Sequence, residues 1–119
     1  MATWQKYLAE HQGRFLAEFK EFLAIPSIST DPQHTPDVHR AAEWVAERLR
    51  AAGFKQAELH ETEGHPIVFG SWLDAPGRPT VLIYGHFDVQ PPEPLELWQT
   101  PPFSPEVRED GSTRGARVT

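Results

Sequence analysis

Residues 79–92 read PTVLIYGHFDVQPP, and this stretch decides how the fold is interpreted. It begins with a continuous run of β-branched and aliphatic side chains, which is typical of a strand buried on both faces. We therefore predict a buried strand over about residues 79–86, with His86 and Asp88 at its C-terminal end. Because side chains alternate along a strand, His86 and Asp88 are expected to point to the same side.

Two amphipathic helices are predicted upstream of this stretch. Residues 3–23 carry apolar side chains at helical spacing, and Pro26 follows their end. A second helix is expected to take Thr35 as its N-cap and Pro36 as its first residue, and to stop at Gly53.

Two further strands are predicted between the helices and the opening stretch, at residues 55–61 and 66–73. Helices followed by strands indicate an α/β layer. Residues 89–110 show neither helical nor strand periodicity, but they combine many prolines with large apolar side chains. This composition predicts a long loop packed onto a surface.

The composition excludes several classes of function. The chain has 119 residues, which is one small domain or part of a larger one. Its net charge of -6, with acidic and basic residues interspersed, argues against capture of nucleic acid or an anionic membrane. It has no cysteine, so a thiol nucleophile and a disulfide framework are both excluded. The absence of cysteine fits a cytoplasmic protein, and no signal peptide or membrane-spanning stretch is recognised.

The histidine and aspartate that follow the predicted strand could carry metal chemistry. Imidazole is a good zinc ligand, and a nearby carboxylate can orient it. Taken alone, however, the pair His86 and Asp88 is more often an ordinary hydrogen bond at a strand end. The remaining histidines lack supporting carboxylates at ligand spacing and are interpreted as solvated or structural; they are His11, His34, His39, His60 and His65.

Three stretches in order resemble one family. They are FLAIPSIST at 22–30, AAEWVAERLRAAGF at 41–54 and YGHFDVQPPEPLELWQTPPFSPEVRE at 84–109. Together they are similar to the aminoacylase, carboxypeptidase and dipeptidase group of zinc peptidases with two adjacent metal ions, and most to its dipeptidase branch. The resemblance implies an α/β fold in which residues 1–110 form the N-terminal portion of the catalytic domain.

The resemblance also implies a site and a reaction. His86 would be a ligand of one of two zinc ions, and Asp88 would be the carboxylate that supports its imidazole. The reaction would be hydrolysis of a dipeptide or a similar small amide by a cytoplasmic enzyme, which can be a homodimer when complete, with no nucleic-acid or membrane partner. The bridging aspartate, the general-base glutamate and the other ligands of the family cannot be placed on this chain. The chain alone is therefore expected to be inactive.

Residues 111–119 depart from the family. The family continues after Asp110-Gly111 with a sequence like Leu-Tyr-Ala-Arg-Gly-Ala-Ser-Asp, in which the last residue bridges the metals. If the nucleotides that encode this tail are read in the frame one nucleotide back, each new codon spans two neighbouring codons of the tail. The codons formed in this way can encode the family's residues in order. We therefore predict a frameshift near Gly111. The alternative is a genuine short protein that keeps the family's N-terminal layer for binding or association without catalysis.

Overall fold

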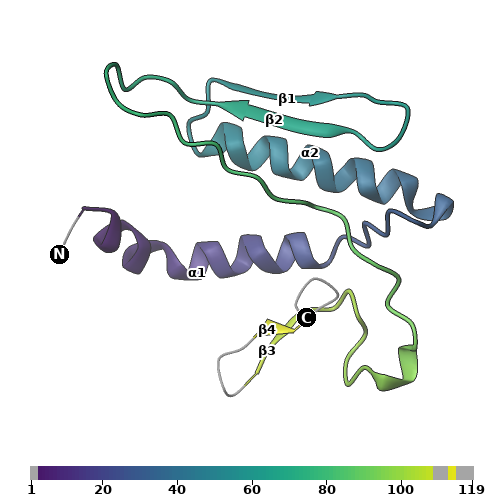
Figure 1. Ribbon diagram of the computed structural model, residues 1–119. Coiled ribbons are helices and arrows are strands. Elements are labelled where there is room, and N and C mark those ends of the chain that lie inside the picture. The colour runs from purple at the N-terminus through teal and green to yellow at the C-terminus, as the bar shows by residue number, and fades with distance from the viewer. Residues whose placement is uncertain (1–2, 109–112, 115–119) are drawn as a thin grey trace. The chain divides into compact units, whose positions relative to one another are not determined.

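The computed structural model describes residues 3–108 and 113–114 (Figure 1). It divides into two compact units. Pro26–Pro91 form one unit, and Met1–Ile25 together with Pro92–Thr119 form the other. The site discussed below lies wholly within Pro26–Pro91, so each unit is described by itself.

Helix α1 spans Thr3–Leu23, as the periodicity of the sequence predicted. Pairs of opposite charge one helical turn apart support it along its exposed side, with Lys6 lying 3.8 Å from Glu10 and Arg14 lying 3.5 Å from Glu18. None of the helices among the described residues is long and apolar enough to cross a membrane.

A short 3-10 turn, η1, leads into the second helix. It spans Pro32–His34 and is capped by Asp31, whose side chain accepts a hydrogen bond from the backbone N–H two residues later. Helix α2 then spans Thr35–Ala51. The prediction that Thr35 is the N-cap was wrong, because the chain enters α2 directly from the turn and Thr35 already has helical backbone angles. Gly53, with φ of 98°, follows the end of α2 as predicted.

Two of the predicted strands form an antiparallel hairpin beside α2 (Figure 1). Strand β1 spans Gln56–His60 and β2 spans Ile67–Ser71, with Ala57 opposite Gly70. Both strands are a few residues shorter than predicted at their ends.

Helix α2 and the hairpin share a small core. Arg50, near the end of α2, donates two hydrogen bonds to the carbonyl of Ala57, at 3.1 Å from Nε and 2.8 Å from Nη2. Gly70 lies so close to the helix that a Cβ there would approach Leu49 Cδ1 to 2.9 Å. The helix contributes four fully buried side chains to this core: Val38, Ala41, Ala42 and Ala46.

The prediction of a buried strand over residues 79–86 was wrong. The segment is extended but belongs to no strand, and the side chains of residues 81–84 are between 78% and 90% exposed. A strand exists only when a neighbouring backbone accepts and donates its hydrogen bonds, and no strand pairs with this segment in the described part of the chain. The run is therefore apolar in composition without being buried.

The C-terminal part of the chain contains more regular structure than predicted. A 3-10 turn, η2, spans Leu95–Leu97. Strand β3, at Glu106–Val107, pairs antiparallel with β4, at Thr113–Arg114. The prediction that residues 89–110 form an irregular loop was wrong for η2 and β3. Apart from Thr113–Arg114, the predicted divergent tail lies outside the described residues.

Candidate metal-ligand site

A short contact between two distant segments fixes the site. Ile28 and Val89 form an isolated parallel bridge. The Val89 N–H donates to the carbonyl of Ser27 at 2.9 Å, and the Ser29 N–H donates to the carbonyl of Val89 at 3.4 Å. The fully buried Ser27 hydroxyl adds a bond of 2.8 Å to the carbonyl of Phe87. These contacts hold the end of the extended segment against residues 27–29.

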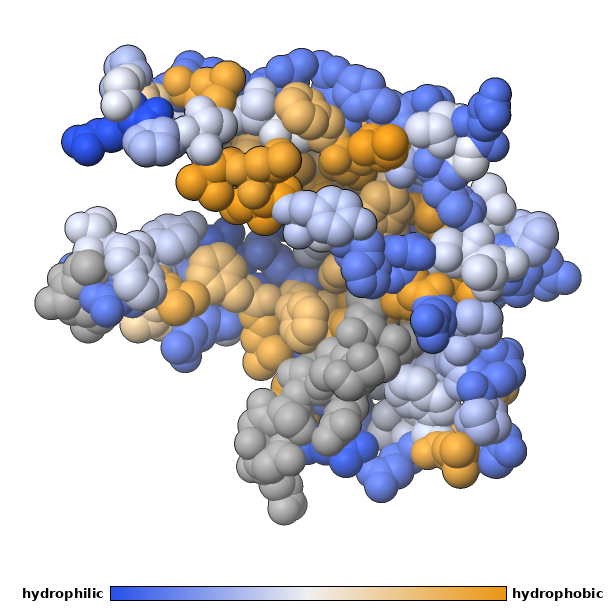
Figure 2. Space-filling view, in the orientation of Figure 1, coloured by the Kyte–Doolittle hydropathy of each residue, from blue (hydrophilic) through white to orange (hydrophobic). Residues whose placement is uncertain are grey.

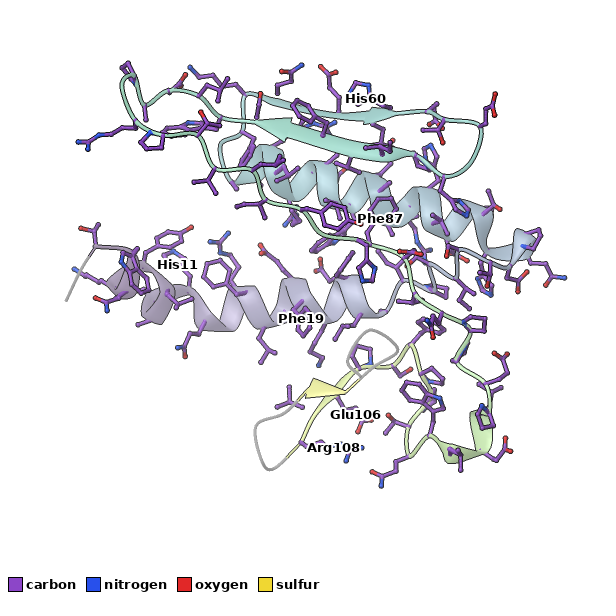
Figure 3. All side chains as sticks on the ribbon, in the orientation of Figure 1. His11, Phe19, His60, Phe87, Glu106 and Arg108 are labelled. Carbon is purple, nitrogen blue, oxygen red and sulfur yellow. The ribbon has the colours of Figure 1, made fainter. Side chains whose placement is uncertain are left out.

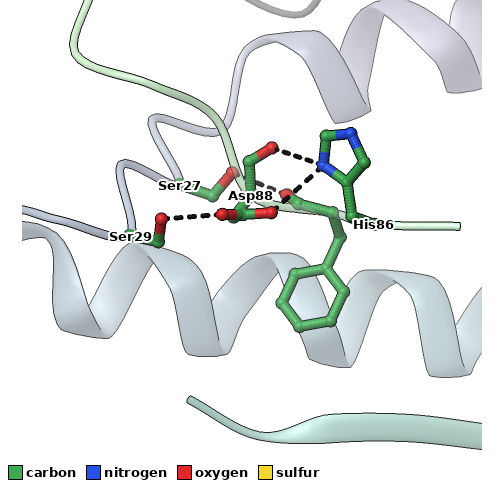
Figure 4. Close-up of polar contacts among 5 residues, drawn as sticks. Ser27, Ser29, His86 and Asp88 are labelled. Carbon is green, nitrogen blue, oxygen red and sulfur yellow. Dashed lines mark hydrogen bonds and ion pairs between the residues drawn. The ribbon is translucent and has the colours of Figure 1, made fainter. Parts of the chain in front are cut away.

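His86 and Asp88 are brought together at this anchored end (Figure 4). His86 Nδ1 lies 3.1 Å from Asp88 Oδ1 and 3.1 Å from the Asp88 carbonyl oxygen. Both neighbours are acceptors, so Nδ1 must carry a proton to bind them. In the neutral imidazole this leaves the lone pair on Nε2. The His86 side chain is 74% exposed, so that lone pair is accessible to a ligand.

The Asp88 carboxylate is shared between two donors. Its Oδ2 accepts a hydrogen bond of 2.7 Å from the Ser29 hydroxyl, while Oδ1 faces His86. The bond from Ser29 is the main cause that lowers the pKa of Asp88 below its usual value; the bond from His86 adds to it, and partial burial opposes it. The carboxylate is therefore ionised at neutral pH.

Reasoning from the sequence missed two residues around this pair, Ser27 and Ser29. Ser27 and Ser29 lie in the stretch at 22–30 that resembles the zinc-peptidase family, but no local pattern ties them to residues about sixty positions later. His65 was interpreted as solvated or structural, and its Nε2 lies 2.7 Å from the carbonyl of Ser29. That contact is a structural one and agrees with the interpretation.

A groove of about 950 Å³ runs beside the pair. It lies between α2, β2 and residues 80–88, and its lining includes both His86 and Asp88. Apolar side chains gather on the surface along the path of the extended segment (Figure 2). Phe87 points toward α2 and also lines the groove (Figure 3). The polar pair thus lines a largely apolar groove.

The residues present fit one ligand position of a metal site. The Asp88 carboxylate contacts Nδ1 of His86 and orients the ring, while Nε2 on the opposite side of the ring is exposed. Metal-binding histidines have the same arrangement. No group of three or more His, Cys, Asp or Glu side chains that could hold an ion occurs among residues 3–108 and 113–114. A four-coordinate ion would therefore need further ligands from elsewhere.

Comparison with known proteins agrees with the resemblance of the motifs. No protein-family model matches the chain. A Cys-Gly metallodipeptidase of Candida albicans is 32% identical over 109 residues, which cover 82% of this chain and 22% of that protein. The Cys-Gly metallodipeptidase of Schizosaccharomyces pombe is 33% identical over 117 residues, covering 91% and 25%. The succinyl-diaminopimelate desuccinylase of Xanthomonas euvesicatoria is 42% identical over 67 residues, covering 55% and 16%.

The fold is also found in a solved structure. The dipeptidase Dug1p of Saccharomyces cerevisiae matches with a TM-score of 0.81 and 24% identity, over 92% of this chain and 26% of that one. The chain thus has the α/β arrangement of part of that enzyme, with two helices followed by strands. Over most of its length the chain is homologous to the dinuclear zinc peptidase family of aminoacylases, carboxypeptidases and dipeptidases, and it spans about a quarter of the length of the metallodipeptidases it matches.

Proposed function

We propose that this chain supplies the N-terminal part of a zinc-dependent hydrolase that acts on dipeptides or similar small amides. Homology to metallodipeptidases over most of the chain supports the class of reaction. The shorter match to a desuccinylase leaves open which small amide is the substrate. The chain spans about a quarter of the length of the metallodipeptidases, so the activity is proposed for a protein of their full length.

In this proposal His86 binds one metal ion through Nε2. The observation that carries the assignment is the pair of acceptors facing Nδ1, which fixes the proton there and leaves Nε2 exposed with its lone pair. Asp88 has no contact with substrate in this role. It orients the ring and raises the basicity of the ligand nitrogen, as carboxylates behind metal-binding histidines do.

When bound, a pair of zinc ions supplies an activated water and polarises the scissile carbonyl. Of the groups needed for that chemistry, this chain provides the ligand His86 and its supporting carboxylate. The general base and the remaining ligands are not assigned to any described residue. We therefore expect the 119-residue chain to hydrolyse no dipeptide above background, even with added zinc. Zinc-dependent turnover that is lost in His86→Ala would refute this expectation.

Zinc binding by the chain tests the ligand assignment directly. Zinc added to chain labelled with 15N-histidine is expected to shift the Nε2 resonance of His86 first, with weak affinity, because one imidazole leaves the other coordination positions to water. His86→Gln should remove the response. His60→Gln is the matched control, because His60 is also largely exposed and lies on the same unit. Equal shifts of all histidines, or none at His86, would contradict the assignment.

A non-catalytic role in association is the second candidate, favoured by the exposed apolar side chains of residues 81–84. The gene discriminates between the two. If the neighbouring frame after Gly111 stays open and encodes the family's aspartate and glutamate motifs, the hydrolase is supported. If a stop codon follows at once in that frame, a short binding protein is the better interpretation.

A further inference from the structure

Ser29 is held from three directions around the candidate ligand. Its N–H donates to the carbonyl of Val89, and its own carbonyl lies 2.7 Å from His65 Nε2. Its hydroxyl donates to Asp88 Oδ2 at 2.7 Å (Figure 4). With the backbone fixed on both sides of the Cα, only the staggered rotamers of the side chain remain, and the one adopted directs the hydroxyl to Asp88. Ser29 is therefore a prearranged donor for one carboxylate oxygen.

The Ser29 bond decides how the Asp88 carboxylate is turned. The terminal torsion of an aspartate is broad and has no strong preference of its own. Asp88 is 43% exposed, so packing alone does not restrict it. With Oδ2 engaged by Ser29, Oδ1 is directed at His86 Nδ1. Without that bond, water can compete for both oxygens and the contact with the imidazole loses its orientation.

We propose that Ser29 is a positioning residue for His86, acting through Asp88 to keep the imidazole proton on Nδ1 and the lone pair on Nε2. The part of this proposal that concerns metal rests on the function proposed above. The part that concerns the tautomer is a property of the metal-free chain. Ser29 itself touches neither metal nor substrate in this role.

Ser27 provides the contrast within the same segment. Its hydroxyl donates to the carbonyl of Phe87 and not to a carboxylate, and its side chain is fully buried. Loss of that hydroxyl should weaken the anchoring of the segment without removing the donor to Asp88. Ser27→Ala is therefore a control for structural damage, and Ser29→Ala is the test of positioning.

The tautomer of His86 is the readout. It is measured on the full chain labelled with 15N-histidine, without metal, by two-bond proton–nitrogen correlation at about pH 8, where an ordinary histidine of pKa about 6.5 is neutral. In the wild type, the Nδ1–H form should dominate at His86. Ser29→Ala should move the resonances toward the Nε2–H form, whereas Ser27→Ala should leave them in place even when its melting temperature falls.

Two substitutions of similar shape separate loss of the hydroxyl from misfolding. Ser29→Thr keeps a hydroxyl and Ser29→Val replaces it by a methyl group, so the two variants differ mainly in the donor. We expect Thr to retain the Nδ1–H form and Val to lose it. The resonances of His60 report in every sample whether the hairpin is folded. An unchanged tautomer in Ser29→Val or Ser29→Ala, with His60 unperturbed, would overturn the proposal.

A zinc titration of the same samples separates this inference from the proposed function. Removing a direct outer partner of a metal ligand costs about 10–100-fold in affinity, and Ser29 is one step further out, so a loss below that range is expected at His86. If the tautomer shifts in Ser29→Ala while zinc never reaches His86 Nε2 in the wild type, the positioning stands and the ligand assignment fails. If zinc binds His86 equally well in wild type and Ser29→Ala and the tautomer is constant, the ligand assignment stands and the positioning role of Ser29 fails.

Discussion

The segment Thr35–Ser71, with α2 and the hairpin, and the extended segment at residues 79–88 belong to the same unit but behave differently. Both are rich in aliphatic side chains. In the first, Val38 is fully buried between elements that contact one another. In the second, Val81 is 78% exposed. An apolar run is therefore buried only where another element of the chain covers it.

The difference follows from how far away the partners are. Each strand of the hairpin finds its partner a few residues away across a short turn, and α2 precedes them directly. Residues 80–84 have extended backbone but no strand beside them within the described residues. Partners in a parallel or mixed sheet are often distant in sequence, because a crossover lies between the paired strands.

Amide exchange should show the largest contrast between the two segments. Amides that bond across the β1–β2 ladder are expected to exchange more slowly than those of residues 81–84 by on the order of a hundredfold or more, because the latter have no backbone partner among the described residues. The Val89 N–H, bonded to Ser27, should mark the point where protection returns. Proton–deuterium exchange followed by NMR measures this. Protection throughout 81–84 would show that the segment is paired in solution.

The same substitution in each segment gives the next largest effect. Val38→Ala removes a fully buried side chain and is expected to lower the free energy of unfolding by about 2 kcal/mol. Val81→Ala should change it by less than about 0.5 kcal/mol, because that side chain is already in water. Urea unfolding followed by circular dichroism measures both. Equal losses would mean that Val81 is covered in solution.

Two glycines sharpen the comparison further. A Cβ at Gly70 would meet Leu49 Cδ1 at 2.9 Å and Phe54 Cδ1 at 3.2 Å, whereas one at Gly85 meets nothing within 4 Å. Gly70→Ala should therefore cost about 1 kcal/mol, since the leucine methyl can shift only partly within the core. Gly85→Ala should leave the melting temperature nearly unchanged. A neutral Gly70→Ala would show that helix and hairpin are loosely packed.

The smallest expected effect is a pH dependence at Asp88. The pKa of Asp88 is lowered in the folded chain, chiefly by the hydrogen bond from Ser29. Asp88 therefore stabilises the folded state at pH values above the usual aspartate pKa of about 3.9. This stabilisation is lost as the pH falls through the lowered pKa of the folded chain. Asp88→Asn should make the decline of stability below about pH 4 less steep. The effect is small because the side chain is 43% exposed. Parallel acid-unfolding profiles for both chains would contradict it.

The sequence predicted the elements whose signals are local. Periodicity located α1, and the positive-φ Gly53 marked the end of α2. The Thr35 cap was misplaced by one residue, because the preceding turn was not recognised. The prediction of a strand at residues 79–86 was wrong, because an apolar composition does not indicate whether another strand is present to pair with the segment.

The site was partly accessible from the sequence for the same reason. Alternation along an extended backbone predicted that His86 and Asp88 share a side, and the structure brings them into contact. The hydroxyls of Ser27 and Ser29 reach the site from a distant segment, and no spacing rule connects them to it. Their contacts with Phe87 and Asp88 depend on the backbone bridge between Ile28 and Val89, which no local pattern predicts.

That bridge has a consequence for the order in which the chain folds. The bond from Ser27 to Phe87 joins residues 60 positions apart, whereas the hairpin and helix form from near neighbours. Closing a long loop is slower and less favourable than forming a hairpin, so we expect the site to assemble after α2 and the hairpin have formed. During synthesis on the ribosome, Ser27 and Ser29 emerge before residues 87–88, so their hydroxyls cannot form these bonds until the later segment has been made. The contact between His86 and Asp88 is thus expected to form after α2 and the hairpin in a nascent chain.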